Sequence, residues 1–403
     1  MNQTNISTPH LLVLLAGIYT LQSTIGAITF QGLPAVLRSY DYGTDTIGFV
    51  YLLMLPWVIK FLWAPAGERY RRSTPSANRR LLMVGVILQV VFLVLLAGAD
   101  PGFSLVLLIA ILLLLALTAS AVDNAGDGFA IDQLARQNLG FGNTIQIGGG
   151  YLGAMLGGGA FLMLVDNYNW SIAVGAIAVI ALLVIFPIDA IPEHTSAPST
   201  ATMQRPTLRA ALRRPMLMGI GIVLIYQCSL RLVQGMMMPF LVDQGVSLTE
   251  LGFIVTFGNS IASLFAVVVI GAVLRRLSPY PVMWVCLLLQ LPVYLAFYYV
   301  STTEQSSLSI ASTLLISQAM ISAAAFVALY TAMMGWAKGS QSGVNFAIFQ
   351  CADTAIAMCA GVASGLLVAW LGYSVFFALA VGIAILALFA LPVLLRRQPR
   401  EAL

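Results

Sequence analysis

The 403-residue chain is 60% hydrophobic and only 8% charged, with a mean hydropathy of +0.94. Soluble globular proteins carry about 25% charged residues, so this composition excludes a soluble protein. Apolar runs of about 20 residues recur from end to end, which predicts an all-α integral membrane protein rather than a β-barrel. The net charge of +4 does not indicate a nucleic-acid partner, because the basic residues cluster between apolar runs and act there as topology signals.

Twelve apolar runs are each long enough to span a membrane, which predicts twelve transmembrane helices. They cover roughly 11–37, 45–65, 81–99, 104–131, 142–165, 171–188, 216–241, 249–274, 281–300, 309–334, 343–370 and 373–395. The longest interruption, 191–215, is rich in Pro, Ser, Thr and Arg. We expect it to be a cytoplasmic linker between two six-helix bundles at 1–190 and 216–403.

The distribution of cationic residues predicts the orientation of these helices. With both termini cytoplasmic, the basic residues of the loops gather on the cytoplasmic side and only Arg38 lies outside. We therefore expect a multi-pass membrane protein that is surrounded by lipid and has both termini in the cytoplasm.

Asp123 and Asp127 end the apolar run that begins near Ser104. Their spacing puts both carboxylates on one helix face, roughly 28 to 35 Å along the helix and so near its cytoplasmic end. Mutual repulsion and desolvation favour protonation of one of them, which suggests a proton-coupling pair. A latch that pairs these acids with Arg69 is an equal alternative.

Arg231 and Asp353 lie deeper, about 22 Å and about 15 Å into their predicted helices. A buried arginine needs an anion, which Asp353 can supply at rest and an anionic substrate can replace. A purely structural ion pair is the alternative. The further polar side chains that we expect to contact a substrate are Tyr226, Gln234, Gln22, Gln146 and Gln350.

The two halves of the chain share short strings at offsets of roughly 203 to 207 residues. The pairs are Ile18-Tyr19 with Ile225-Tyr226, Gln31-Gly32 with Gln234-Gly235, Pro34 with Pro239, and Ile47-Gly48-Phe49 with Leu251-Gly252-Phe253. Parallel six-helix repeats joined by a long inside linker resemble the plan of major facilitator superfamily transporters. This resemblance implies a substrate site near the membrane midplane.

The string from Leu53 to Pro65, followed by Glu68-Arg69-Tyr70-Arg71-Arg72, resembles the loop 2–3 signature of that superfamily. The version found here is shared by muropeptide permeases, acetyl-CoA transporters and bacterial siderophore transporters. The resemblance implies a cytoplasmic gate, with Lys60, Glu68 and Arg69 as its residues.

A glycine-rich run, Gly148 to Gly159, has small residues four apart, which predicts close helix packing. It also resembles the helix-5 antiporter motif of drug exporters, but Ala154 stands where that motif has proline.

Three strings resemble the rhizobactin/pyochelin-type siderophore importers: Asp123 to Ala130, Gly140 to Asn143 with Ile145 to Gly149, and Gly343 to Asp353. This resemblance implies an importer of a ferric siderophore that works by alternating access, with protons and without a cofactor. A muropeptide permease and a siderophore exporter are the alternatives within the same fold.

A membrane enzyme or an inert scaffold is the alternative outside transport. The sequence has no Ser/His/Asp set or cysteine pair for an enzyme, and His10 and His194 lie too far apart in sequence to suggest a metal site. An inert scaffold would not retain Arg231 and Asp353 inside apolar helices. We therefore predict neither an enzyme nor a metal centre.

Overall fold

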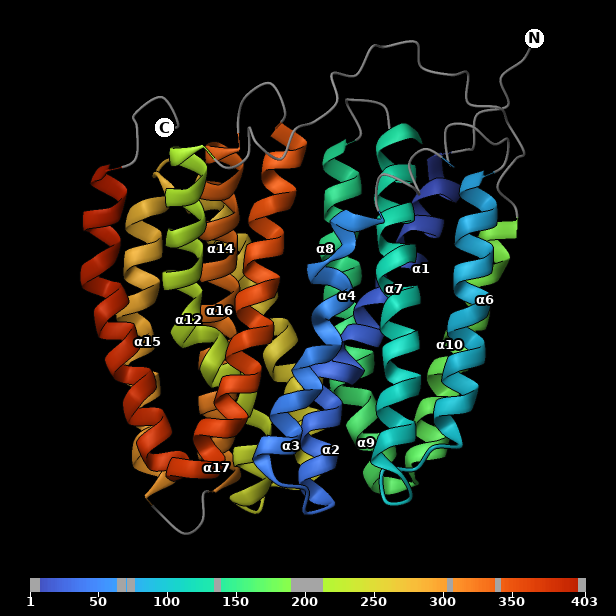
Figure 1. The fold of residues 1–403 in the computed structure, drawn as a ribbon, viewed down its shortest axis with the longest axis horizontal. Coiled ribbons are helices and arrows are strands. Elements are labelled where there is room, and N and C mark those ends of the chain that lie inside the picture. The colour runs from blue at the N-terminus through green and yellow to red at the C-terminus, as the bar shows by residue number, and fades with distance from the viewer. Residues whose placement is uncertain are drawn as a thin grey trace. The chain divides into compact units, whose positions relative to one another are not determined.

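The computed structural model describes residues 8–63, 70, 77–133, 139–189, 213–302, 307–337 and 342–397. These residues form helices joined by short turns, and no strand occurs among them (Figure 1). Ten of the described helices are long and apolar enough to cross a membrane, and Thr44–Val58 adds a shorter apolar one. The chain is therefore a multi-pass, all-helical membrane protein.

The backbone packs into two compact units. Unit 1 takes the described residues of Met1–Tyr40, Ile59–Ala201 and Leu251–Thr256. Unit 2 takes those of Asp41–Val58, Thr202–Glu250 and Phe257–Leu403. Each unit therefore includes a short segment from the opposite half of the sequence.

Unit 1 is organised around its first helix, which packs against α8, α7 and α10, while α6 packs against α7 and α10. Its elements are α1 (Thr8–Ala27), η1 (Ile28–Gly32), α2 (Leu33–Ser39), η3 (Lys60–Leu62), α6 (Ala77–Ala97), α7 (Leu105–Gln133), α8 (Leu139–Ala154), η5 (Met155–Ala160), α9 (Phe161–Asn167) and α10 (Trp170–Asp189). Segments α1, η1 and α2 run on without a break from His10 to Ser39, so they form one membrane-length helix.

Unit 2 is organised around the contact of α12 with α17, and α15 packs on both α16 and α17. Its elements are α3 (Thr44–Phe49), η2 (Val50–Met54), α4 (Leu55–Val58), α12 (Arg214–Asp243), α14 (Ser260–Val273), α15 (Pro279–Ser301), α16 (Leu308–Trp336) and α17 (Ser342–Arg397). The segments α13 (Leu248–Phe253) and η6 (Ile254–Asn259) are divided between the two units. Gly372 breaks α17 with φ 74° and ψ 168°, a conformation open to glycine, so α17 is two helices joined at a bend.

The second predicted helix, 45–65, is not one regular α-helix. It begins as α3, tightens into the 3₁₀ segment η2, continues as α4 and ends at Ile59, whose φ of −97° and ψ of 7° leave the helical region. Pro56 explains the irregularity, because its ring clashes with the carbonyl of residue i−4, here Leu52, and it has no N–H to donate.

Glycines let two pairs of helices approach closely. A Cβ atom on Gly157 would collide with the Thr24 carbonyl and lie 3.0 Å from the Ile28 nitrogen, so η5 packs directly on α1. In unit 2, a Cβ atom on Gly365 would lie 2.6 Å from the Gly48 Cα, where α17 meets α3. The packing role predicted for the glycine-rich run is confirmed at Gly157.

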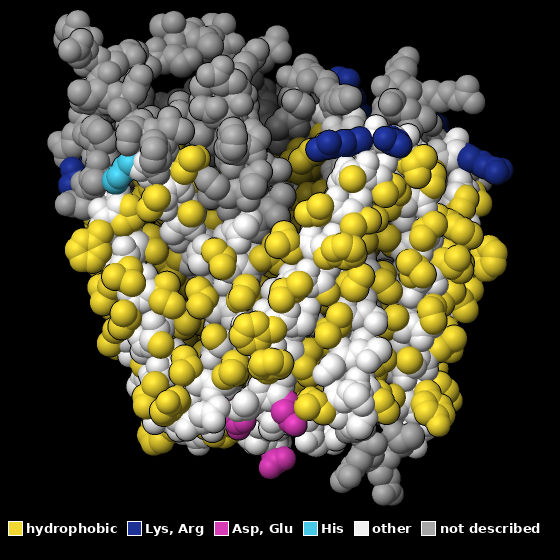
Figure 2. All heavy atoms as spheres, turned by 180° about the vertical axis from the view of Figure 1, so that it is seen from behind, with side chains coloured by type: hydrophobic (Ala, Val, Ile, Leu, Met, Phe, Trp, Pro, Cys, Tyr) yellow, Lys and Arg dark blue, Asp and Glu magenta, His cyan; other side chains and the backbone are white. Residues whose placement is uncertain are grey.

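The outward faces of the described helices are hydrophobic, as a surface in contact with lipid requires. In unit 2 several charged residues lie at helix ends: α12 runs from Arg214 to Asp243, and Arg275 and Arg276 follow the end of α14. Figure 2 shows basic side chains at the upper edge, acidic side chains at the lower edge and a hydrophobic surface between them.

Candidate substrate site

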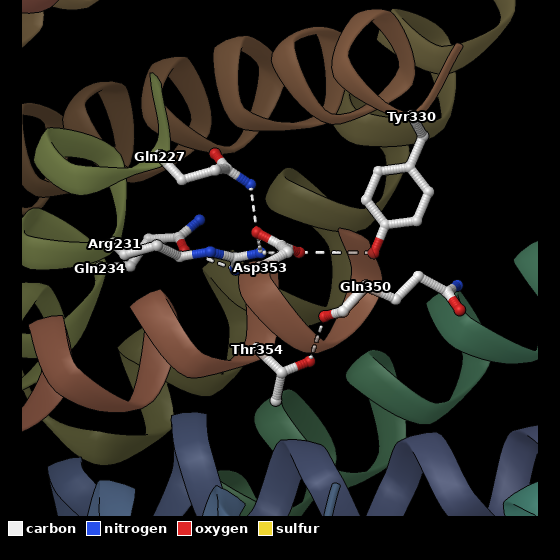
Figure 3. A network of polar contacts seen from close by, with 7 residues as sticks. All are labelled: Gln227, Arg231, Gln234, Tyr330, Gln350, Asp353 and Thr354. Atoms are coloured by element: carbon white, nitrogen blue, oxygen red, sulfur yellow. Dashed lines mark hydrogen bonds and ion pairs between the residues drawn. The ribbon is translucent and has the colours of Figure 1, made fainter. Parts of the chain in front are cut away.

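A polar site in unit 2 centres on the Asp353 carboxylate of α17. Arg231 of α12 donates from one terminal nitrogen to both carboxylate oxygens, at 3.0 and 2.9 Å. Gln227 donates to Oδ1 at 2.7 Å, and the Tyr330 hydroxyl of α16 donates to Oδ2 at 3.3 Å (Figure 3). Two helices, α12 and α16, therefore supply donors to one carboxylate on a third, of which only 5% of the side-chain surface is exposed.

Arg231 uses only part of its donor capacity in this site. Its second terminal nitrogen donates to Oε1 of Gln234 at 3.3 Å, and its buried Nε has no hydrogen-bond partner among the described residues. The side chain is 21% exposed, whereas that of Asp353 is almost wholly enclosed. Such a guanidinium can accept a second anion on the edge that faces away from Asp353.

The structure brings together Arg231, Asp353 and Gln234, as the sequence predicted, but separates two other predicted contacts from them. Tyr226 lies in the hydrophobic core of unit 2, 1% exposed and packed with residues such as Cys286 and Phe349. Figure 3 shows the Gln350 side chain pointing away from the Asp353 carboxylate, while its backbone carbonyl accepts from Thr354 at 3.0 Å.

Sequence reasoning missed Gln227 and Tyr330, which hold Asp353 from two further directions. Gln227 precedes Arg231 by four residues, so helical spacing alone places both on one face of α12. The sequence thus carries a signal for Gln227, whereas the adjacent Tyr226, the predicted contact, lies in the core. Tyr330 lies 23 residues from Asp353 on another helix, and no local pattern links the two.

In unit 1 the predicted acids lie in a second polar site. Lys60 lies 3.5 Å from the Asp123 carboxylate, with side-chain exposures of 22% and 21%. Tyr19 donates to Asp127 at 3.0 Å, and the Gln146 amide donates to the same oxygen at 3.4 Å. The two neighbouring carboxylates thus have different partners, one cationic and the other neutral.

Gln22 forms a neutral pair with Gln89 inside unit 1. Each amide donates to the other, at 3.3 and 3.0 Å, and Gln89 is fully buried. This reciprocal arrangement uses one donor and one acceptor of each side chain. Gln89 was not predicted, because a single glutamine in an apolar helix gives no indication of its partner.

The predicted gate residues Glu68 and Arg69 lie outside the described residues, so the hypothesis of a latch to Arg69 stays a prediction. Within the described part of the chain, no cluster of three or more His, Cys, Asp or Glu side chains could hold a metal ion. The polar sites that the structure does describe are pairs and networks suited to binding charged or hydrogen-bonding solutes.

The family model of the Major Facilitator Superfamily matches residues 12–317 and 223–403. The chain belongs to this superfamily. It is therefore a secondary transporter with a membrane-embedded fold, and not an enzyme.

Relatives agree with this assignment. An uncharacterized protein of Haemophilus influenzae is 25% identical over 273 residues, which are 65% of this chain and 64% of that protein. The chain thus matches slightly less than two thirds of the length of this relative. The anhydromuropeptide permease of Escherichia coli K12 is 24% identical over 389 residues, which are 93% of this chain and 77% of the permease.

Solved structures show the same fold. The crystal structure of a single-residue mutant of the nucleoside transporter NupG aligns with a TM-score of 0.73 at 13% identity, covering 95% of this chain and 99% of that one. At this identity the likeness concerns the fold alone.

Proposed function

We propose that this transporter carries an anionic solute, which binds Arg231 in place of part of its contact with Asp353. The observation that carries the proposal is the guanidinium itself: it lies among apolar helices, remains 21% exposed and keeps a buried Nε that has no hydrogen-bond partner among the described residues. Charged side chains inside membrane segments are costly and usually serve a substrate or ion path. A guanidinium fully satisfied by Asp353 would have no donor left for a second anion.

Asp353 would keep hydrogen bonds from other side chains when the solute binds Arg231. Gln227 and Tyr330 donate to it independently of the arginine, at 2.7 and 3.3 Å. Two neutral donors reduce the cost of separating the ion pair, because the carboxylate is not left without hydrogen bonds. The anion could then bind and leave while the carboxylate keeps two hydrogen bonds from neutral donors.

A ferric siderophore is the first candidate solute, supported by the strings in α7, α8 and α17 that resemble siderophore importers. Ferric chelates are often anionic and would fit a site with one exposed guanidinium. An anhydromuropeptide is the second candidate, supported by the relative that aligns over 93% of this chain. Its peptide carboxylates would engage Arg231 in the same way.

We further propose that both termini are cytoplasmic, that twelve helices form bundles at 1–190 and 216–403 joined by 191–215, and that the protein works as a monomer in a bacterial inner membrane. Protons would enter through Asp123 and Asp127, close to Lys60 and to the gate residues Glu68 and Arg69. Tyr19 and Gln146 would then stabilise Asp127 in its charged form. Gln22 and Gln350 remain candidate contacts in the solute path, and so does Tyr226 if its helix rotates during transport.

The test is solute accumulation in cells with and without this protein, at two external pH values. One set of cells receives a panel of labelled ferric siderophores and a parallel set a labelled anhydromuropeptide. Uptake of one class that depends on the protein, and that Arg231→Ala abolishes at unchanged expression, supports the proposal and selects the solute. Greater accumulation in cells that lack the protein would show that the protein exports the solute instead of importing it.

Normal uptake by Arg231→Ala would refute the anion site. The matched control is Arg214→Ala, which removes an arginine from the first turn of the same helix, far from Asp353. We expect this variant to transport normally.

A further inference from the structure

Three aromatic side chains adjoin the Asp353 site on the side of α16. The ring centroids of Phe326 and Tyr330 lie 3.9 Å apart at an interplanar angle of 30°. Phe346 of α17 meets Tyr330 edge to face, with centroids 5.9 Å apart and an angle of 86°. We call these three side chains the aromatic platform.

The hydrogen bond between Tyr330 and Asp353 orients the Tyr330 ring of the platform. The hydroxyl of Tyr330 donates to Asp353, so the ring of Tyr330 stands directly beside the carboxylate that also binds Arg231 (Figure 3). Phe326 and Phe346 lie against this ring, so the three rings together form an apolar, unsaturated surface next to the site. A tyrosine held at both its ring and its hydroxyl has little freedom left to lose when a ligand binds.

The platform is also open. Phe326 is 41% exposed, and both Tyr330 and Phe346 are only half-buried. The neighbouring Arg231 side chain is 21% exposed, and an exposed guanidinium is tolerated facing water but is costly facing hydrocarbon. The hydroxyl of Tyr330 and this guanidinium both contact the Asp353 carboxylate, so the partly exposed ring and the partly exposed charge lie beside the same group.

We propose that Phe326, Tyr330 and Phe346 bind a flat aromatic ring of the transported anion while its negative group binds Arg231. This inference rests on the anion site proposed above and adds the shape of the solute next to its charge. Ring pairs gain from offset or edge-to-face contact, which a puckered saturated ring of the same size provides less well. The solute class would be aromatic carboxylates, phenolates or larger anions that carry such a ring.

The probes are benzoate and cyclohexanecarboxylate, tested by isothermal titration on the full-length protein in nanodiscs. Both carry one carboxylate on a six-membered carbon ring, but only benzoate is flat and unsaturated. We expect benzoate to bind roughly 2- to 12-fold more tightly, the range expected for one aromatic contact. Cyclohexanecarboxylate is at least as apolar, so nonspecific partition into lipid does not predict this order.

Variants separate the platform from the charge. Phe326→Leu keeps the apolar surface but removes the ring, and we expect it to abolish the preference for benzoate while leaving the affinity for cyclohexanecarboxylate unchanged. Tyr330→Phe keeps the ring and should retain the preference. The matched control is Phe389→Leu on α17, where the phenylalanine is 72% exposed and outside the platform; we expect wild-type behaviour.

The outcomes distinguish this inference from the proposed function. If Arg231→Ala abolishes binding of both probes and wild-type protein binds them equally, the anion site stands and the platform is refuted. If neither probe binds at millimolar concentration, or if Arg231→Ala binds both as wild type does, the anion site fails and the platform with it. An equal effect of Phe326→Leu and Phe389→Leu would show that Phe326 contacts lipid only.

Discussion

Arg231 of unit 2 and Thr24 of unit 1 each lie five residues after the tyrosine of a string that the two halves share, Ile225-Tyr226 and Ile18-Tyr19. The two side chains behave differently. Thr24 is fully buried and donates to the Thr20 carbonyl of its own helix at 2.7 Å, whereas Arg231 reaches across to α17. One position thus supports tight packing in unit 1 and an ion pair in unit 2.

The surroundings explain the difference. Gly153 and Gly157 approach the backbone of α1 beside Thr24 so closely that no long side chain fits there. Around Arg231, the donors and acceptors of Gln227, Gln234 and Asp353 occupy the corresponding space. In unit 1 the buried polar pair, Gln22 with Gln89, is neutral. The ion pair of unit 1 is longer, with 3.5 Å between Lys60 Nζ and Asp123 Oδ2, and both side chains are about one-fifth exposed. The comparison teaches that the two repeats share a helix plan but not a chemistry.

The largest expected effect is that of Arg231→Ala on unit 2. Removing the cation leaves Asp353 buried with only neutral donors, which should lower the free energy of unfolding by about 3 to 5 kcal/mol, as measured by denaturation in detergent. The double variant Arg231→Ala/Asp353→Ala should recover much of that loss but not uptake. If the double variant is no more stable than the single one, the charge comparison between the units is wrong.

A smaller effect is expected for the neutral pair in unit 1. Gln89→Leu leaves the buried amide of Gln22 without its partner and should lower the free energy of unfolding by about 1 to 3 kcal/mol. The double variant Gln22→Leu/Gln89→Leu should restore stability, because both polar groups are then absent. Loss of uptake in this stable double variant would show instead that Gln22 contacts solute.

Tyr330→Phe sharpens the description of the Asp353 site. It removes one hydrogen bond of 3.3 Å and keeps the ring, so we expect a loss of about 1 kcal/mol in the free energy of unfolding. Uptake should fall a few-fold rather than vanish, since Gln227 and Arg231 still hold the carboxylate. An effect as large as that of Arg231→Ala would mean that the Tyr330 hydroxyl, and not only its ring, binds solute directly.

The smallest effect on stability is expected for Lys60→Met. The pair with Asp123 is long and partly exposed, so its loss should change the free energy of unfolding by less than about 1 kcal/mol. If the pair belongs to the gate, uptake should nevertheless fall markedly. A variant with unchanged uptake and unchanged response to external pH would remove Lys60 from the gate.

The sequence by itself determined the class of this protein. Runs of apolar residues of membrane length demand helices, because only a helix satisfies its backbone within one segment in lipid, and ten such helices are present among the described residues. Repeated strings in the two halves indicated the superfamily. Arg231 and Asp353 predicted an ion pair with each other, because a single charge in an apolar surrounding is not stable without a partner of opposite sign.

Only the tertiary structure decided which neutral residues complete the site. Gln227 rather than Tyr226 reaches Asp353, Tyr330 joins from a third helix, and Gln22 finds Gln89 across the bundle. A charge in an apolar helix requires a partner of opposite sign, and the chain offers few. A neutral amide or hydroxyl accepts almost any partner, so its choice depends on helix rotation and packing, which local sequence does not specify.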